Sequence, residues 1–143
     1  MTEAPLQTRP FCPHAAPMAV ALGALNALIA VGAGAYGWHA IDADDAGQAI
    51  FMMGSQYQMW HGLALIGTGL MGNAFPVVAR RAAWAAVLFL LGIVFFSGTL
   101  YAFGLLGIVP VPHLAPIGGA ALMAGWALMV WAGFSTSRGN RTG

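Results

Sequence analysis

The chain has 143 residues, of which 59% are hydrophobic and only 6% are charged, and its formal net charge is +1. A soluble domain carries about 25% charged residues. This chain therefore lacks the charge to cover a water-facing surface, and we expect a membrane protein. Its five cations, all arginine, make no basic face, which argues against binding to nucleic acid.

The apolar runs predict one transmembrane domain between two tails. Residues 1–16 are rich in proline, which breaks helices, and residues 136–143 are polar. The domain between them, residues 17–135, contains four runs near the length of about 20 residues that a span needs. These expected spans cover residues 18–38, 56–75, 84–106 and 114–134. Because the connections are short, neighbouring spans should pack antiparallel as an up-down-up-down four-helix bundle.

A polar break is expected between His39 and Ser55. It contains Asp42, Asp44 and Asp45, but it lacks the bidentate glutamate and the ligand alternation of a calcium loop. We therefore interpret it as a solvated acidic connector, with a short interfacial helix over residues 46–53.

The arginines predict the orientation. With four spans, the N-terminal tail, the second loop and the C-terminal tail share one side of the membrane. All the arginines fall on that side, at positions 9, 80, 81, 138 and 141. Since positive residues stay cytoplasmic, both termini are expected in the cytoplasm.

Polar side chains within apolar spans are costly and are often functional. In the second span, Tyr57 and Gln58 lie one turn from His61, which is about 9 Å inside the membrane if the span begins near residue 55. Ser97 and Tyr101 rise to the same depth in the third span. The two spans are joined by a short loop, so we expect these five residues to form a hydrogen-bonded cluster in the outer half of the bundle.

His61 has two interpretations. A neutral imidazole bonded to a hydroxyl or a carbonyl would hold helices together, whereas a proton relay or a metal or haem ligand would be functional. His39 and His113 fall at the same outer end, so a three-histidine metal site is conceivable. No short-range spacing motif links these histidines, however. We therefore prefer the structural interpretation and expect neither a metal nor a cofactor.

Close helix packing is predicted by small and amide residues. Asn26, in the middle of the first span, should bond to Thr68 or to a backbone carbonyl, because a buried amide needs a partner. Small residues let membrane helices approach closely, and the expected packing positions are Gly37, Gly62, Gly98, Gly118 and Gly119.

Four stretches together resemble a known family. They are residues 34–40 (GAYGWHA), 57–65 (YQMWHGLAL), 96–101 (FSGTLY), and 115–119 (APIGG) followed by 124–126 (AGW). In this order the chain is similar, over residues 20–132, to the small four-span membrane proteins of the domain-of-unknown-function 423 family, also called UPF0382. The resemblance implies the fold and a location in bacterial membranes, and it implies no activity.

The expected protein is thus an all-α, multi-pass protein of the bacterial inner (plasma) membrane. Its spans hold no nucleophile–base pair, phosphate loop or paired carboxylates, so we do not expect an enzyme. The preferred function is that of a non-catalytic accessory or scaffold protein. Its expected partners are the lipid bilayer and either a second copy or a larger membrane complex. The alternative is a transport or redox role, with a proton, a metal or haem, centred on His61.

Overall fold

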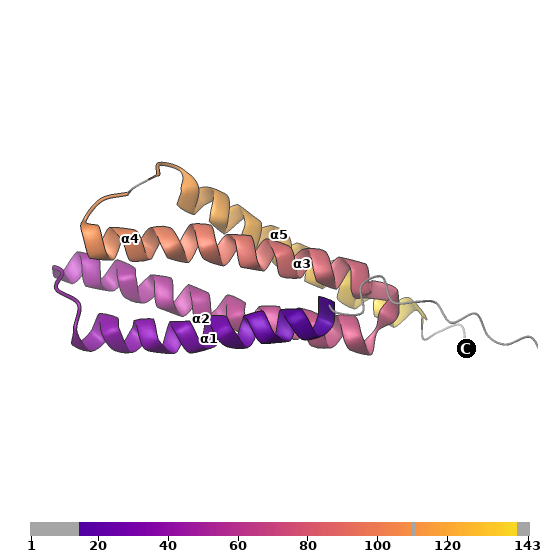
Figure 1. Cartoon of the computed structure of the whole chain (residues 1–143). Coiled ribbons are helices and arrows are strands. Elements are labelled where there is room, and N and C mark those ends of the chain that lie inside the picture. Colours follow the sequence, from indigo (N-terminus) through magenta and orange to yellow (C-terminus); the bar gives the residue numbers. More distant parts are fainter. Residues whose placement is uncertain (1–14, 110, 140–143) are drawn as a thin grey trace, which may run out of the picture.

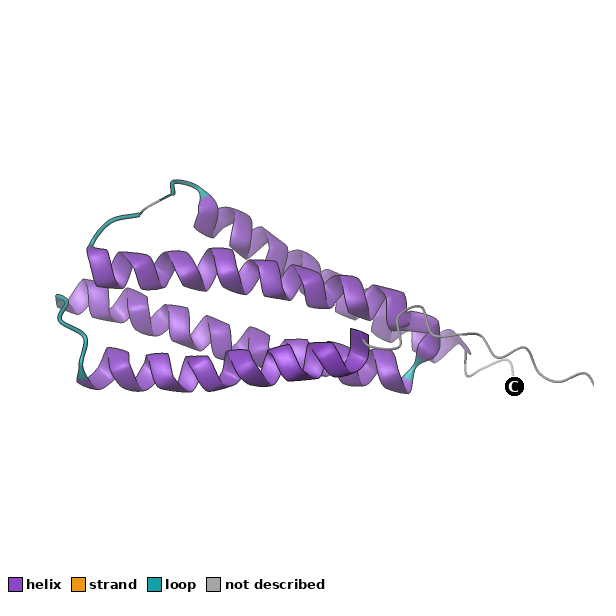
Figure 2. Cartoon of the chain, in the orientation of Figure 1, coloured by secondary structure: helices purple, strands orange, loops and turns teal. Residues whose placement is uncertain are grey.

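The computed structural model describes residues 15–109 and 111–139, and within these ranges it contains helices and no strand. The main helices are α1 (Ala15–His39), α2 (Asp45–Ala74), α3 (Ala79–Gly92), α4 (Gly98–Leu106) and α5 (Leu114–Gly139). A 3-10 turn, η1 (Pro76–Val78), precedes α3, and a π-helical turn, η2 (Ile93–Ser97), joins α3 to α4. The segments from η1 to α4 form one rod, so the chain makes four rods that alternate in direction (Figure 1, Figure 2).

The expected all-α class is therefore confirmed for the described residues. The proline-rich tail expected over residues 1–16 lies outside them as far as residue 14, and residues 140–143 of the polar tail also lie outside.

The second helix begins much earlier than the sequence suggested. Asp44 caps α2, because its Oδ1 accepts a hydrogen bond from the Gly47 amide at 2.7 Å. Asp45 adds a negative charge to the first turn, where the helix dipole favours it. The expected break as far as Ser55 is therefore wrong, and the supposed interfacial helix over residues 46–53 is the start of α2 itself. His61 consequently lies about 24 Å along α2, near the middle of the rod and not about 9 Å from its end.

A proline follows the end of α2, and a glycine ends α4. Pro76 follows α2 and has no amide hydrogen to continue its hydrogen-bond ladder. Gly107 ends α4 in the left-handed conformation, with φ of 67°, and its amide donates to Phe103 O at 2.8 Å. This is the usual role of glycine just past a helix end.

Helices α1 and α2 meet along a line of contacts that repeats every seven residues on each helix. We call it the α1–α2 seam; it pairs residues 37, 30, 23 and 16 of α1 with residues 48, 55, 62 and 69 of α2. In the first two layers, polar side chains of α2 donate to carbonyls of α1: Gln48 Nε2 to Gly37 O and Ser55 Oγ to Ala30 O, both at 2.8 Å.

In the other two layers of the seam, glycine replaces the polar side chain. A Cβ at Gly62 would lie 3.1 Å from Gly23 O, and one at Gly69 would lie 2.6 Å from Ala16 O. The seven-residue repeat is typical of a left-handed supercoil of two helices. The carbonyls of α1 are thus in contact with α2 over the length of both helices.

The expected packing glycines differ in what surrounds them. Gly37 and Gly62 lie in the α1–α2 seam, and Gly118 of α5 packs against the backbone of η2, where a Cβ would lie 2.5 Å from Phe96 N. Gly119 makes only ordinary contact with the Phe96 ring, and a Cβ at Gly98 would meet nothing within 4 Å. The expectation that Gly98 packs between helices is therefore wrong.

Glycines besides these five also make close contacts between helices. A Cβ at Gly104 of α4 would lie 2.6 Å from the Cβ of Phe51, and one at Gly125 of α5 would lie 2.7 Å from the Phe89 ring. The first contact joins α4 to α2, and the second joins α5 to α3. The buried core, formed by Ala64, Leu65, Ala85, Phe89 and Leu122, lies where α2, α3 and α5 converge.

The four rods form an open array. Helix α2 packs against α1 on one side and against α3 and α4 on the other, and α5 packs mainly against α3 and η2. Helix α5 diverges from α4 toward the connection between them (Figure 1). Helices α1 and α5 do not pack along each other, so they form two edges of the array.

Three of the helical segments are long and apolar enough to cross a membrane: Ala15–His39, Pro76–Leu106 and Leu114–Thr136. They correspond to the expected first, third and fourth spans. Helix α2 does not meet the same criterion, because polar side chains interrupt its apolar sequence. The structure thus fits a multi-pass membrane protein with three apolar segments.

We predict that Gly118→Ala destabilises the protein by about 1–3 kcal/mol, because the added methyl group would press on backbone atoms of η2 that cannot move aside. Gly98→Ala is the matched control, since its methyl group would enter open space and alanine favours a helix by about 1 kcal/mol. The thermal unfolding midpoint of each variant in the same detergent measures the difference. Equal midpoints for the two variants would contradict the close approach of α5 to η2.

Candidate functional site

A chain of three polar side chains joins three helices in the interior. Tyr101 of α4 donates its hydroxyl to Gln58 Oε1 at 2.7 Å, and Gln58 Nε2 donates to Asn26 Oδ1 of α1 at 3.1 Å. Asn26 Nδ2 then donates to Leu22 O at 2.8 Å. We call Asn26, Gln58 and Tyr101 the amide chain. Both amide groups are hydrogen-bonded in it, and since amides do not ionise, Asn26 and Gln58 hold helices in register without supplying an acid or a base.

Asn26 was expected to bond either to a backbone carbonyl or to Thr68. The bond to a carbonyl, Leu22 O, is confirmed, and the bond to Thr68 is wrong. Thr68 Oγ1 donates to Leu65 O in its own helix at 2.7 Å. The hydrogen bond that Asn26 accepts from Gln58 was not expected from the sequence.

His61 lies on another side of α2. Its Nδ1 is 2.8 Å from Tyr57 O. A carbonyl oxygen only accepts hydrogen bonds, so Nδ1 carries the hydrogen; in a neutral ring, Nε2 is then the nitrogen that holds the lone pair. The side chain is 6% exposed and lies among aromatic rings: the ring centroids of Phe89 and Trp126 are 5.8 and 6.2 Å away, and that of Tyr57 is 5.8 Å away. His61 therefore contacts α3 and α5, whereas Gln58 contacts α1 and α4.

Ser97 differs from the other hydroxyl residues of the interior. It is 1% exposed, and its Oγ is the one buried side-chain oxygen or nitrogen in the described part of the chain without a hydrogen-bond partner. Serine and threonine in helices commonly donate to the carbonyl four residues earlier, as Thr99 does to Phe95 O at 2.6 Å. For Ser97 that carbonyl is Ile93 O, which accepts the Gly98 amide in the π-helical turn; the Ser97 hydroxyl does not bond to it.

The five residues of the expected cluster thus fall into separate environments. Gln58 and Tyr101 are brought together, and His61 and Tyr57 pack with aromatic rings. Ser97 bonds to none of them. The expectation of a single hydrogen-bonded cluster is therefore wrong, because residues 58 and 61 point toward different neighbouring helices.

The three histidines that were considered for a metal site are not gathered. His39 ends α1 and His113 lies in the loop before α5, and both are exposed, whereas His61 is buried in the middle of α2. Across residues 15–109 and 111–139, no group of three or more histidine, cysteine or acidic side chains is placed to hold a metal. Of these three histidines only His61 is buried, so its Nε2 is the candidate ligand atom in the interior.

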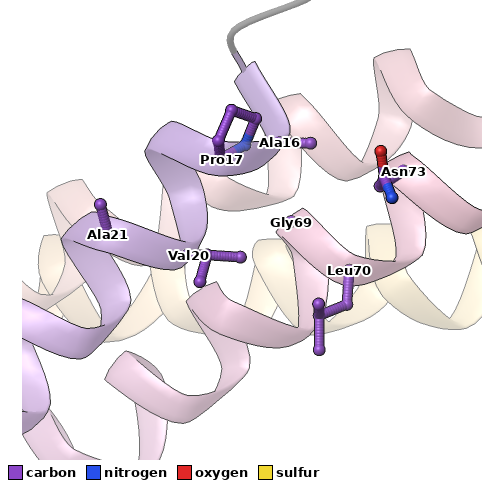
Figure 3. A pocket seen from close by; sticks show the side chains of 7 residues that line it. All are labelled: Ala16, Pro17, Val20, Ala21, Gly69, Leu70 and Asn73. Atoms are coloured by element: carbon purple, nitrogen blue, oxygen red, sulfur yellow. The ribbon is translucent and has the colours of Figure 1, made fainter.

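A cleft of about 550 Å³ lies between the start of α1 and the end of α2 (Figure 3). The side chains that line it are apolar except for the amide of Asn73, and its lining includes Gly69, where a Cβ would lie 2.6 Å from Ala16 O. No ionisable side chain lines it, so it has room for an apolar group but offers no acid–base chemistry.

The aromatic residues around His61 are the part of the site that sequence reasoning missed. Phe89 and Trp126 also contact each other, with ring centroids 5.2 Å apart. A usable signal was present, because Gly125 precedes Trp126 and a glycine next to a large ring often marks a close contact.

We predict that Tyr101→Phe destabilises the protein by about 0.6–1.7 kcal/mol, because it leaves Gln58 Oε1 without its donor. Tyr57→Phe is the control, since the Tyr57 hydroxyl is not part of the amide chain. A comparison of unfolding midpoints in detergent measures the effect. A cost for Tyr57→Phe equal to that for Tyr101→Phe would show that the bond to Gln58 contributes nothing.

Comparison with known proteins agrees with this architecture. The model of the family described as "Protein of unknown function (DUF423)" matches residues 33–119. A UPF0382 membrane protein of Staphylococcus epidermidis is 39% identical over 113 residues, which is 78% of this chain and 90% of the relative. The UPF0382 membrane protein YwdK of Bacillus subtilis is 34% identical over 115 residues, which is 78% of this chain and 91% of the relative.

No solved structure matches the chain. The relatives are named only as membrane proteins, so the comparison assigns a family and no activity. The family match covers α2, α3, η2 and α4 in full, together with the end of α1 and the start of α5. The chain is a member of the DUF423 (UPF0382) family of membrane proteins.

Proposed function

We propose that all four rods cross the bacterial inner membrane and that both termini are cytoplasmic. Helix α2 lies between the apolar segments α1 and Pro76–Leu106, and it is at least as long as α1. Its polar side chains Gln48, Ser55 and Gln58 bond to neighbouring helices, so they need not face lipid. The positions of the five arginines support the cytoplasmic side for the termini.

Labelling of single cysteines tests this topology. In a Cys12→Ser background, His113→Cys should react with a membrane-impermeant maleimide added to intact spheroplasts. Arg80→Cys, one rod length away, should react only after the membrane is opened. Reaction of the Arg80→Cys variant in intact spheroplasts would contradict the proposed orientation.

We propose that the protein is a non-catalytic accessory or scaffold protein that associates laterally with other membrane proteins or with itself. The observation that carries this proposal is the open array, because α1 and α5 do not cover each other. Both edges present large apolar side chains to the outside, including Leu28 and Val31 on α1 and Met123, Val130 and Phe134 on α5.

The use of the interior polar groups also supports a structural role. The side chains of Asn26 and Gln58 hold the rods together, and those of Ser55 and Thr68 bond to carbonyls. None of these bonds needs a substrate or a cofactor to be complete. A scaffold requires such a self-contained interior, because its outer faces do the binding.

The alternative function is a transport or redox role for His61. It is supported by the orientation of the ring, since Nε2 keeps a lone pair inside the aromatic surroundings of Phe89 and Trp126. An imidazole nitrogen of this kind can accept a proton or ligate a metal or haem iron.

One purification separates the two functions. The protein is extracted from its own membranes in mild detergent at native abundance, and wild type is compared with His61→Ala and with Leu28→Ala as an edge control. The scaffold proposal expects a colourless, metal-free protein that copurifies in stoichiometric amounts with a defined membrane partner or as a defined oligomer. A Soret band or stoichiometric metal that disappears in His61→Ala would overturn it in favour of the alternative.

A further inference from the structure

Arg81, in the first turn of α3, is held in place by two residues of α5. Its Nη1 donates to Ser135 Oγ at 2.7 Å, and its guanidinium carbon lies 4.2 Å from the centre of the Trp131 ring. Ser135 in turn donates to Trp131 O at 2.8 Å, which fixes the acceptor. The planar guanidinium is therefore stacked on one face and fixed at one edge. Of its five N–H donors, the bond to Ser135 uses one.

The positive charge of Arg81 has no matching negative charge in the described part of the chain. The carboxylates there are Asp42, Asp44 and Asp45, which lie at the start of α2, whereas α3 begins beyond the end of α2. The length of α2, about 45 Å, separates the two ends. Among the described residues, therefore, no carboxylate is close enough to pair with the half-buried guanidinium of Arg81, and a partner from outside these residues would be favourable.

The position of Arg81 in α3 does not compensate for the missing carboxylate. Its position near the start of a helix is one where the helix dipole disfavours a cation, and no acidic residue lies in the first turn of α3. At the end of a membrane helix, the anion present at high concentration is the phosphate of the lipid headgroups. A guanidinium fork matches the oxygen atoms of a phosphate group, with two parallel hydrogen bonds.

We propose that Arg81, oriented by Trp131 and Ser135, binds the phosphate group of an anionic phospholipid. The neighbouring Arg80 has the same charge at the same end of the rod, but it is exposed and has none of the contacts that orient Arg81. The two arginines therefore serve as a matched pair for comparison. Arg81 is held by Trp131 and Ser135, whereas Arg80 is attracted to an anionic membrane surface only through its charge.

The test uses native mass spectrometry of the full chain in neutral detergent, titrated with phosphatidylglycerol or with phosphatidylcholine. Wild type should retain phosphatidylglycerol in preference. Arg81→Gln should weaken that binding about tenfold or more, because a charge-assisted hydrogen bond is lost. Arg80→Gln should weaken it by at most about fivefold, which is the value of one charge near an anionic surface.

Two further variants distinguish a loss of lipid binding from a general loss of stability. Arg81→Lys keeps the charge but loses the fork and the stacking, and Ser135→Ala keeps the arginine but frees it; both should lose most of the lipid preference. If Arg81 only held α3 to α5, Arg81→Gln would lower the unfolding midpoint equally in both lipids and leave the preference unchanged. That outcome would overturn the proposal, as would equal losses for Arg80→Gln and Arg81→Gln.

The source of the phosphate is separated by competition. Orthophosphate added at the same concentration as the lipid should leave the bound phosphatidylglycerol in place, because the lipid is also held by the surrounding apolar surface. Displacement of the lipid by orthophosphate would show that the site takes free phosphate and would overturn a lipid as its ligand.

Discussion

The backbone carbonyls of α1 set the spacing on which the rest of the array depends. In lipid, no hydrophobic force draws helices together, so association depends on close packing and interhelical hydrogen bonds. The α1–α2 seam provides both, because donors at Gln48 and Ser55 and glycines at positions 62 and 69 follow one line down α2. With that face of α2 occupied by α1, Gln58 bonds to both α1 and α4, and His61 packs against α3 and α5.

Much of the architecture was readable from the sequence, because long apolar runs separated by prolines and polar residues indicate the rods, although the third rod begins at Pro76 and contains Arg80 and Arg81, which were expected in the loop before it. The larger exception was α2. Residues 46–55 contain glycine, glutamine and serine, which in isolation resemble a loop, so the expected start at residue 56 is eleven residues later than the observed start at Asp45. The seven-residue spacing of Gln48, Ser55, Gly62 and Gly69 carried the missing information, since these side chains face α1 and not water.

The candidate site was only partly predictable, and for a geometrical reason. Matching depth along two rods correctly suggested that residues 58 and 101 meet, but depth does not say which helix each side chain faces. Residues 58 and 61 are separated by less than one turn, yet they contact different helices. The π-helical turn η2 adds a second difficulty, because it shifts the helical phase after residue 93; Ser97, the last residue of this turn, has no hydrogen-bond partner for its hydroxyl. Nothing in the sequence around residue 93 signals that shift.

The length of the third rod has a consequence for the kind of bilayer that suits this protein. Its 31 residues, Pro76–Leu106, rise about 46 Å, whereas the hydrocarbon layer of a typical bilayer is about 30 Å thick. Tilting alone would need an angle beyond the 0–40° that membrane helices show, so the rod must extend into the headgroup layers at its ends. With those layers included, a bilayer is about 40–45 Å thick. The length of the rod therefore matches the thickness of the whole bilayer and not that of its hydrocarbon layer. In a thinner or thicker membrane, different residues at the ends of the rod would lie among the headgroups.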